Sequence, residues 1–165
     1  MSHIFRVIKP ALFLIIILAA GFGLFFKQNE VYRLQELPEL TWALLATVDA
    51  DFIPSEVRRY TSNAAIPIRI AGFVVPLSDS IKKIKEFLLV PDSMSCIHVP
   101  PPPSNQMILV QLNQEIDIDL ANGPVWVSGY LKLNNESHSF GTSTFTLSGL
   151  NVLPYEALNL ALGIR

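Results

Sequence analysis

Two short segments of this chain share one pattern around a central glycine. Residues 68–74 read Ile-Arg-Ile-Ala-Gly-Phe-Val, and residues 125–131 read Val-Trp-Val-Ser-Gly-Tyr-Leu. Bulky apolar residues alternate with others before each glycine, which is typical of β-strands. A strand bends easily at glycine, and a small closed sheet needs such bends to turn its corners. The repeat therefore predicts two strands of a small barrel, kinked at Gly72 and Gly129.

Three further segments have the composition of strands, namely residues 86–91, 107–112 and 142–153. Acidic residues and isoleucine also alternate with period two from residue 115 to residue 119. No helical pattern separates these segments regularly, as it would in a parallel α/β fold. We therefore predict a mainly β fold, a five-stranded barrel of the oligonucleotide/oligosaccharide-binding (OB) type with short flanking helices.

The remaining elements are expected to be short. Residues 38–48 have proline and acid in the first turn and apolar residues at helical spacing, which predicts an amphipathic helix anchored by Trp42. Residues 81–85 suit a helical turn or a hairpin connection equally. We also predict an irregular segment, a turn and a closing helix at residues 49–63, 134–137 and 155–162, respectively.

An apolar run without charge occupies residues 10–26. At a rise of about 1.5 Å per residue, a run of roughly 17 to 20 residues just crosses the hydrocarbon core of a membrane. Arg6 and Lys9 precede the run, whereas Lys27 and Glu30 follow it and cancel, so the positive-inside rule keeps the N-terminus in the cytoplasm. A cleaved signal peptide, cut near Ala19, is the alternative.

This topology predicts four regions. Residues 1–9 are cytoplasmic, residues 10–26 form a transmembrane anchor, residues 27–37 form a stalk, and residues 38–165 form an exported domain. We expect a bacterial inner-membrane protein with its domain in the periplasm. All 14 acidic residues follow the run, and nine of the 12 basic ones remain when Arg6, Lys9 and Lys27 beside it are set aside, so the exported part carries about −5. A negative domain is not attracted to nucleic acid, which we exclude as a partner.

The only cysteine of the chain, Cys96, stands two residues before His98. In an extended segment residues i and i+2 face the same side, so the thiolate and the imidazole would project together. Both are ligands for zinc or copper, and His138 is the candidate for a third ligand. Asp92 and Glu136 are possible oxygen donors. This pattern is half of a metal site.

Other roles for these two residues remain open. A lone cysteine is often a small buried apolar side chain, and a histidine often binds a backbone carbonyl. A nucleophilic Cys96 activated by His98 would be catalytic, but no nearby residue is an obvious orienting group. A thiol oxidoreductase usually has a second cysteine, and this chain has one. We therefore predict that the protein is not an enzyme.

Four consecutive prolines, Pro100, Pro101, Pro102 and Pro103, follow the cysteine and histidine. Such a run favours the stiff polyproline II conformation, which serves as a recognition surface or as a rigid strap. The side-chain amides of Asn105 and Gln106, just beyond it, would either donate to a ligand or brace the loop. This stretch is the candidate recognition loop.

The stretch around Cys96 also carries a resemblance to a known family. Arg-Ile-Ala-Gly-Phe-Val-Val-Pro-Leu at residues 69–77, the Cys-Ile-His-Val-Pro-Pro-Pro-Pro-Ser-Asn-Gln run at 96–106, and Val-Leu-Pro-Tyr at 152–155 resemble the bacterial DUF3299 family. Met-Ser at 94–95 and Ser104 depart from its usual pattern. The resemblance implies an exported or membrane-attached small β domain, associated in some relatives with metal-responsive transport systems.

Two functions are consistent with these patterns. In the first, the protein is a membrane-tethered accessory protein that binds zinc or copper through the Cys-x-His motif and serves a membrane transporter. In the second, it is a non-catalytic interaction module of an envelope complex, and Cys96 and His98 have structural roles.

Overall fold

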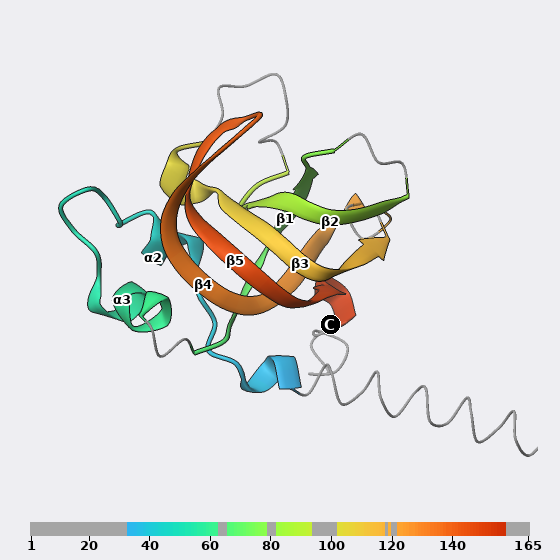
Figure 1. Ribbon diagram of the computed structural model, residues 1–165. Helices are drawn as coiled ribbons and strands as arrows, with labels where there is room; N and C mark the ends of the chain where they lie inside the picture. Colours follow the sequence, from blue (N-terminus) through green and yellow to red (C-terminus); the bar gives the residue numbers. More distant parts are fainter. Residues whose placement is uncertain are drawn as a thin grey trace, which may run out of the picture. The chain divides into compact units, whose positions relative to one another are not determined.

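Five strands form a sheet that closes on itself (Figure 1). Their hydrogen-bonded order is β1-β2-β3-β5-β4, and β4 pairs back with β1. The pairing of β3 with β5 is parallel and the other pairings are antiparallel. A mainly β fold with five strands and short helices is thereby confirmed. The strands are β1 (Ile68–Pro76), β2 (Lys83–Val90), β3 (Ile108–Asp117), β4 (Pro124–His138) and β5 (Gly141–Pro154).

The computed structural model describes residues 33–62, 66–78, 82–93, 102–117, 119 and 122–157. The chain divides into two units, Met1–Glu36 and Leu37–Arg165. In the first unit the described residues, 33–36, form one helical turn. The predicted anchor, Cys96, His98, Pro100 and Pro101 lie outside the described residues. Within them, no helix has the length and apolar character needed to span a membrane.

The two glycine-centred segments of the sequence are neighbours in the sheet. Ile68 of β1 pairs with Gly129 of β4, and Gly72 of β1 pairs with Val125. A Cβ at Gly72 would lie 2.8 Å from the Val90 carbonyl oxygen, closer than real side chains approach. A Cβ at Gly129 would meet the carbonyl oxygen of Ser148, at a register shift between β4 and β5. Both glycines are therefore required by close backbone approach.

The helix that we predicted at residues 38–48 is much shorter. It is α2 (Trp42–Leu45), and the Thr41 hydroxyl caps it by accepting from the Leu44 amide. Residues 38–40 are extended, because their backbone groups bond to Arg69 of β1 instead. The anchoring role of Trp42 is confirmed: its indole Nε1 donates to the Ala71 carbonyl at 2.6 Å.

A second helix, α3 (Ser55–Thr61), occupies the segment that we predicted to be irregular, and that prediction is wrong. Pro54 does not break this helix but precedes it, and the Pro54 carbonyl accepts from the Arg58 amide at 2.9 Å. A proline is well tolerated there, because the first helical N–H groups have no helical partner. Val57 and Tyr60, one turn apart, are buried in the core.

The secondary structure of three other segments can be compared with our predictions. Residues 83–85 are part of strand β2, where Lys83 and Ile84 pair with β3, so they form neither the helical turn nor the hairpin connection. The turn predicted at residues 134–137 is wrong, because β4 runs through them to His138 and the chain turns at residues 139–140. The predicted closing helix begins at residues 155–157, and residues 158–165 lie outside the described part.

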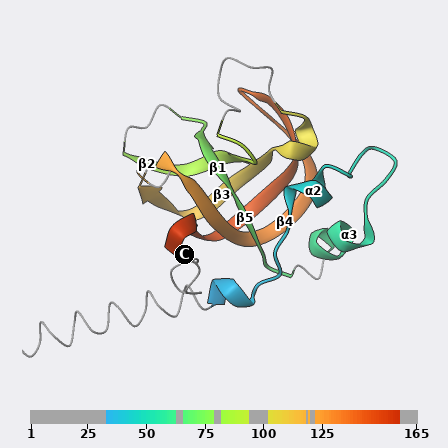
Figure 2. The same cartoon turned by 180° about the vertical axis from the view of Figure 1, so that it is seen from behind.

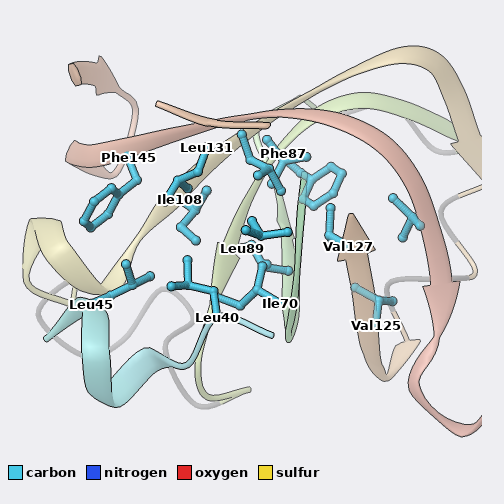
Figure 3. Packing of buried hydrophobic residues seen from close by; sticks show 14 of the residues in the cluster. Leu40, Leu45, Ile70, Phe87, Leu89, Ile108, Val125, Val127, Leu131 and Phe145 are labelled. Atoms are coloured by element: carbon cyan, nitrogen blue, oxygen red, sulfur yellow. The ribbon is translucent and has the colours of Figure 1, made fainter. Parts of the chain in front are cut away.

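The core fills the inside of the closed sheet (Figure 3). Phe87, Phe145 and Leu131 come from the strands, and Leu40 and Leu45 come from the segment that holds α2. A second cluster lies on β1, β2 and β3 and includes Leu88, Val90, Met107 and Leu109, so β2 is buried on both faces. Seen from both sides, α2 and α3 lie beside β4 (Figures 1 and 2). This arrangement brings the segment after α2 close to the β4–β5 hairpin.

Candidate functional site

The end of the candidate recognition loop is tied to α2. A 3-10 turn, η1 (Ser104–Gln106), precedes β3. Asn105 Nδ2 donates to the carbonyls of Ala46 at 3.2 Å and Val48 at 2.9 Å, and Gln106 Nε2 donates to the Trp42 carbonyl at 3.2 Å. The Ala46 and Val48 carbonyls, just after α2, take these donors, and the Trp42 carbonyl, which also accepts from the Ala46 amide, gains a second one. The amide nitrogens thus brace the loop.

Pro103 is the residue through which this loop enters η1. Its φ of −53° and ψ of 149° are close to polyproline II, and its carbonyl accepts from the Gln106 amide at 2.8 Å. Ser104 is also held in place, because Thr144 Oγ1 of β5 donates a hydrogen bond to Ser104 Oγ at 2.9 Å. Residues 103–106 therefore form a rigid wall between α2 and β5.

An open cleft of about 570 Å³ lies against this wall. Three parts of the chain enclose it: the connection from α2 to α3, the end of the proline loop, and the β4–β5 ribbon near its register shift. It is lined by Val48, Asp49, Ala50, Ile53, Pro103, Ser104, Asn105, Leu133, Asn134, Asn135 and Thr144. This cleft is the candidate functional site.

The cleft offers apolar contacts together with neutral hydrogen-bonding groups. Leu133, at 37 % exposure, is one of few exposed large apolar side chains in the described part of the chain. Asp49 is the one ionisable residue of the lining, and its Oδ1 accepts from the amides of Asp51 at 2.9 Å and Phe52 at 2.7 Å. The 49–52 segment is thus preshaped. Such a mixture suits binding of a neutral or cationic partner more than acid–base chemistry.

His138, our candidate for a third metal ligand, ends β4 at the tip of the hairpin. Its Nδ1 accepts from the Phe140 amide at 3.2 Å, and Phe140 packs against the second apolar cluster. Burial lowers the pKa of His138, so the imidazole is neutral at pH 7. A neutral ring whose Nδ1 accepts carries its proton on Nε2, and neither nitrogen then has a lone pair for a metal.

The two candidate oxygen donors are also in the described part. Glu136 Oε1 accepts from Asn134 Nδ2 at 2.7 Å, next to the cleft. Asp92 follows the end of β2. Among the described residues, no three His, Asp or Glu side chains gather closely enough to hold a metal ion. Cys96 and His98 are outside that set.

Comparison with known proteins identifies the family. The family model "Protein of unknown function (DUF3299)" matches residues 47–154, which include all five strands and the residues that line the cleft. The chain belongs to the DUF3299 family. A DUF3299 family protein from Pseudomonas aeruginosa PAO1 has a similar crystal structure, with 31 % identity, a TM-score of 0.55, and coverage of 72 % of this chain and 96 % of that chain. No curated protein matches.

Family membership was predicted correctly from the sequence, but the cleft of this DUF3299 domain was not. Asn134 and Asn135 read as turn residues, because paired asparagines are common in turns. Residues 134–138 are all polar, so no alternation of apolar and polar residues marked the continuation of β4 to His138. No sequence pattern in residues 48–53, which line another side of the cleft, indicated a binding site.

Replacing Asn105 with alanine should destabilise the DUF3299 domain by about 1–3 kcal/mol, because the half-buried bond to the Val48 carbonyl is lost together with the exposed bond to the Ala46 carbonyl. Urea denaturation of residues 28–165 measures this loss. The control is Asn135→Ala, which truncates an exposed amide in the same cleft and should change stability by no more than about 0.5 kcal/mol. Equal effects of the two substitutions would show that the Asn105 brace contributes nothing.

The stability of the DUF3299 domain should fall as the pH drops below about 6.5, in part because of His138. Its pKa is lower in the folded state, so between the two pKa values the unfolded chain binds more protons. The loss begins at the unfolded pKa and is complete below the folded one. Thermal denaturation from pH 7.5 to 4.5 should show a shallower decline for His138→Gln, and parallel curves would contradict the assignment.

Proposed function

We propose that this DUF3299 protein is a non-catalytic interaction module with an OB-type barrel, tethered to the bacterial inner membrane and facing the periplasm. The strand order β1-β2-β3-β5-β4, with parallel β3 and β5, supports the OB assignment. The apolar run at residues 10–26 and the charges beside it support the tether. The domain would then present its surface to proteins of the envelope.

The observation that carries this proposal is the cleft. Residues 103–106, which form one wall of the cleft, are held by the hydrogen bonds from the Asn105 side chain to the Ala46 and Val48 carbonyls. The hydrogen bond between Ser104 and Thr144 holds them as well. Preformed clefts with few polar groups and some apolar surface are the usual form of binding sites. Its lining holds one carboxylate, already used to shape the 49–52 segment, so binding explains it better than catalysis.

In-cell photo-crosslinking tests the interaction. A photoreactive residue is introduced at Asn135, which lines the cleft and is exposed, and separately at Ala43, which is exposed on α2 and does not line it. We expect discrete crosslinked species from position 135 and none from position 43. The same crosslinking pattern at both positions, or no product at position 135 in growing cells, would contradict the proposal.

A second proposal keeps the metal function. Cys96 and His98 would bind zinc or copper for a transport system, as the Cys-x-His spacing suggests. Support from the structure is limited to the neutral state of His138, which a metal ligand requires, although its Nδ1 would first have to release the Phe140 amide.

Elemental analysis of the protein, purified without chelator, tests the metal. Near-stoichiometric zinc or copper should be present in the wild type and lost in Cys96→Ser and His98→Ala while the fold is retained. If His138 contributes, His138→Gln should weaken binding as well. Protein that remains free of metal after the ions are added would remove this proposal and leave the interaction function unaffected.

A further inference from the structure

The outer part of β4 has an open edge beside the cleft. β1 pairs with β4 as far as Gly129, and from Tyr130 to His138 the described residues give β4 one strand neighbour, β5. Figure 1 shows this part of β4 and β5 as a curved ribbon that continues beyond the rest of the sheet. Unpaired backbone N–H and C=O groups on such an edge can pair with another extended chain.

The cleft borders this outer part of β4. Leu133, Asn134 and Asn135 all line it, although successive residues of a strand point to opposite faces. The alternation of faces is interrupted at this point of β4, so these three residues can reach the same cleft. The register between β4 and β5 also shifts between Leu133 and Glu136, which leaves backbone groups there outside the regular ladder. The cleft thus offers main-chain donors and acceptors as well as side chains.

The charges around the cleft select the occupant. Asp49 is the ionisable lining residue, and exposed Asp51 and Glu136 lie next to lining residues. Two cations are close: Arg58, whose Nη2 donates to the Ile53 carbonyl at 3.5 Å, and exposed Lys132, which is next to the lining residue Leu133, against three carboxylates. Carboxylates therefore predominate. The apolar surface of Leu133, together with Phe52, which is 57 % exposed beside the cleft, favours an apolar side chain in the partner.

We propose that the open edge of β4 in this cleft binds an extended polypeptide segment of alternating apolar and basic residues as an added strand. Main-chain hydrogen bonds supply affinity, and the alternation places apolar side chains on Leu133 while basic ones meet the carboxylates. The inference rests on the proposed interaction function and names its partner class and its binding mode.

The test uses full-length protein in mild detergent and fluorescein-labelled peptides of eight residues, measured by fluorescence anisotropy. The probe alternates valine and lysine. One comparison peptide replaces lysine with glutamate, and another carries N-methyl groups on alternate backbone nitrogens. We expect saturable binding of the probe, at least tenfold weaker binding of the N-methylated peptide, and none of the glutamate peptide. Equal binding of the N-methylated peptide, or no binding of the probe, would overturn strand addition.

Two variants locate the site. Ala50→Trp fills the cleft from an exposed loop position, and Asn135→Arg adds bulk and positive charge on the β4 side. Each should weaken probe binding at least tenfold, whereas Ala43→Trp, the matched control on α2, should leave it unchanged. Thermal denaturation verifies that all three variants are folded. Probe affinity unchanged in both cleft variants would overturn the site.

The outcomes separate this inference from the interaction function. If the peptides fail to bind but crosslinking at position 135 persists in cells, strand addition is wrong and the interaction function stands. If crosslinking at position 135 also fails, both strand addition and the interaction function are wrong.

Discussion

Replacing Phe145 with alanine should destabilise the domain by about 3–5 kcal/mol, the largest effect that we expect from a single truncation. Phe145 is fully buried at one end of the core inside the closed sheet and pairs with Ile108 of β3 and Leu133 of β4 (Figure 3). Its ring lies where strands from three parts of the sequence meet. The cavity left by alanine cannot collapse without moving β3 or β4, whose backbones are held by the ladder.

Urea denaturation of residues 28–165, followed by circular dichroism, measures the loss. The matched control is Leu150→Ala on the same strand, where the side chain is 53 % exposed, and a change of no more than about 0.5–1 kcal/mol is expected. Comparable losses for the two variants would contradict the position of Phe145 inside the sheet. An unfolded Phe145→Ala variant agrees with the expectation, and Phe145→Leu then gives a measurable intermediate value.

Replacing Gly129 with alanine should destabilise the domain by about 3 kcal/mol, although it adds a single methyl group. The new Cβ would meet the Ser148 carbonyl oxygen and would lie 3.0 Å from Gly149 Cα. Both contacts are backbone atoms of a paired strand, so neither can move aside as a flexible side chain would. Relief requires separating β4 from β5 at the register shift.

Gly123→Ala is the control, because a Cβ at Gly123 has no atom within 4 Å and its stability should change by less than about 0.5 kcal/mol. Gly72→Ala should behave like Gly129→Ala, since its Cβ would lie 2.8 Å from the Val90 carbonyl oxygen. The three variants are compared by thermal denaturation. If Gly129→Ala and Gly123→Ala melt at the same temperature, the close approach of β4 and β5 is not as described.

The strands were predictable because their signals are local. Alternation with period two identified β1 and β4, and the continuous apolar run of residues 87–90 matches a strand that is buried on both faces. Family membership followed from short motifs at residues 69–77, 96–106 and 152–155. Helix ends were predicted less well: Pro54 looked like a breaker, and it became the start of α3 because Val57 and Tyr60 had a core to enter.

The site depends on contacts between distant parts of the chain. Asn105 could brace the loop or donate to a ligand until the carbonyls of Ala46 and Val48, nearly 60 residues earlier, were found beside it. The same holds for His138, whose usefulness as a ligand depends on which nitrogen accepts from the Phe140 amide. No pattern along the sequence contains that information.

The sequence by itself determined the mainly β fold, the five strands and the DUF3299 family, because alternation and motif spacing are properties of neighbouring residues. The tertiary structure decided that the two glycine-centred strands pair with each other, and that α2, the proline loop and the β4–β5 ribbon enclose one cleft. Sheet closure brings these segments together, and closure depends on long-range pairing that short-range patterns do not encode.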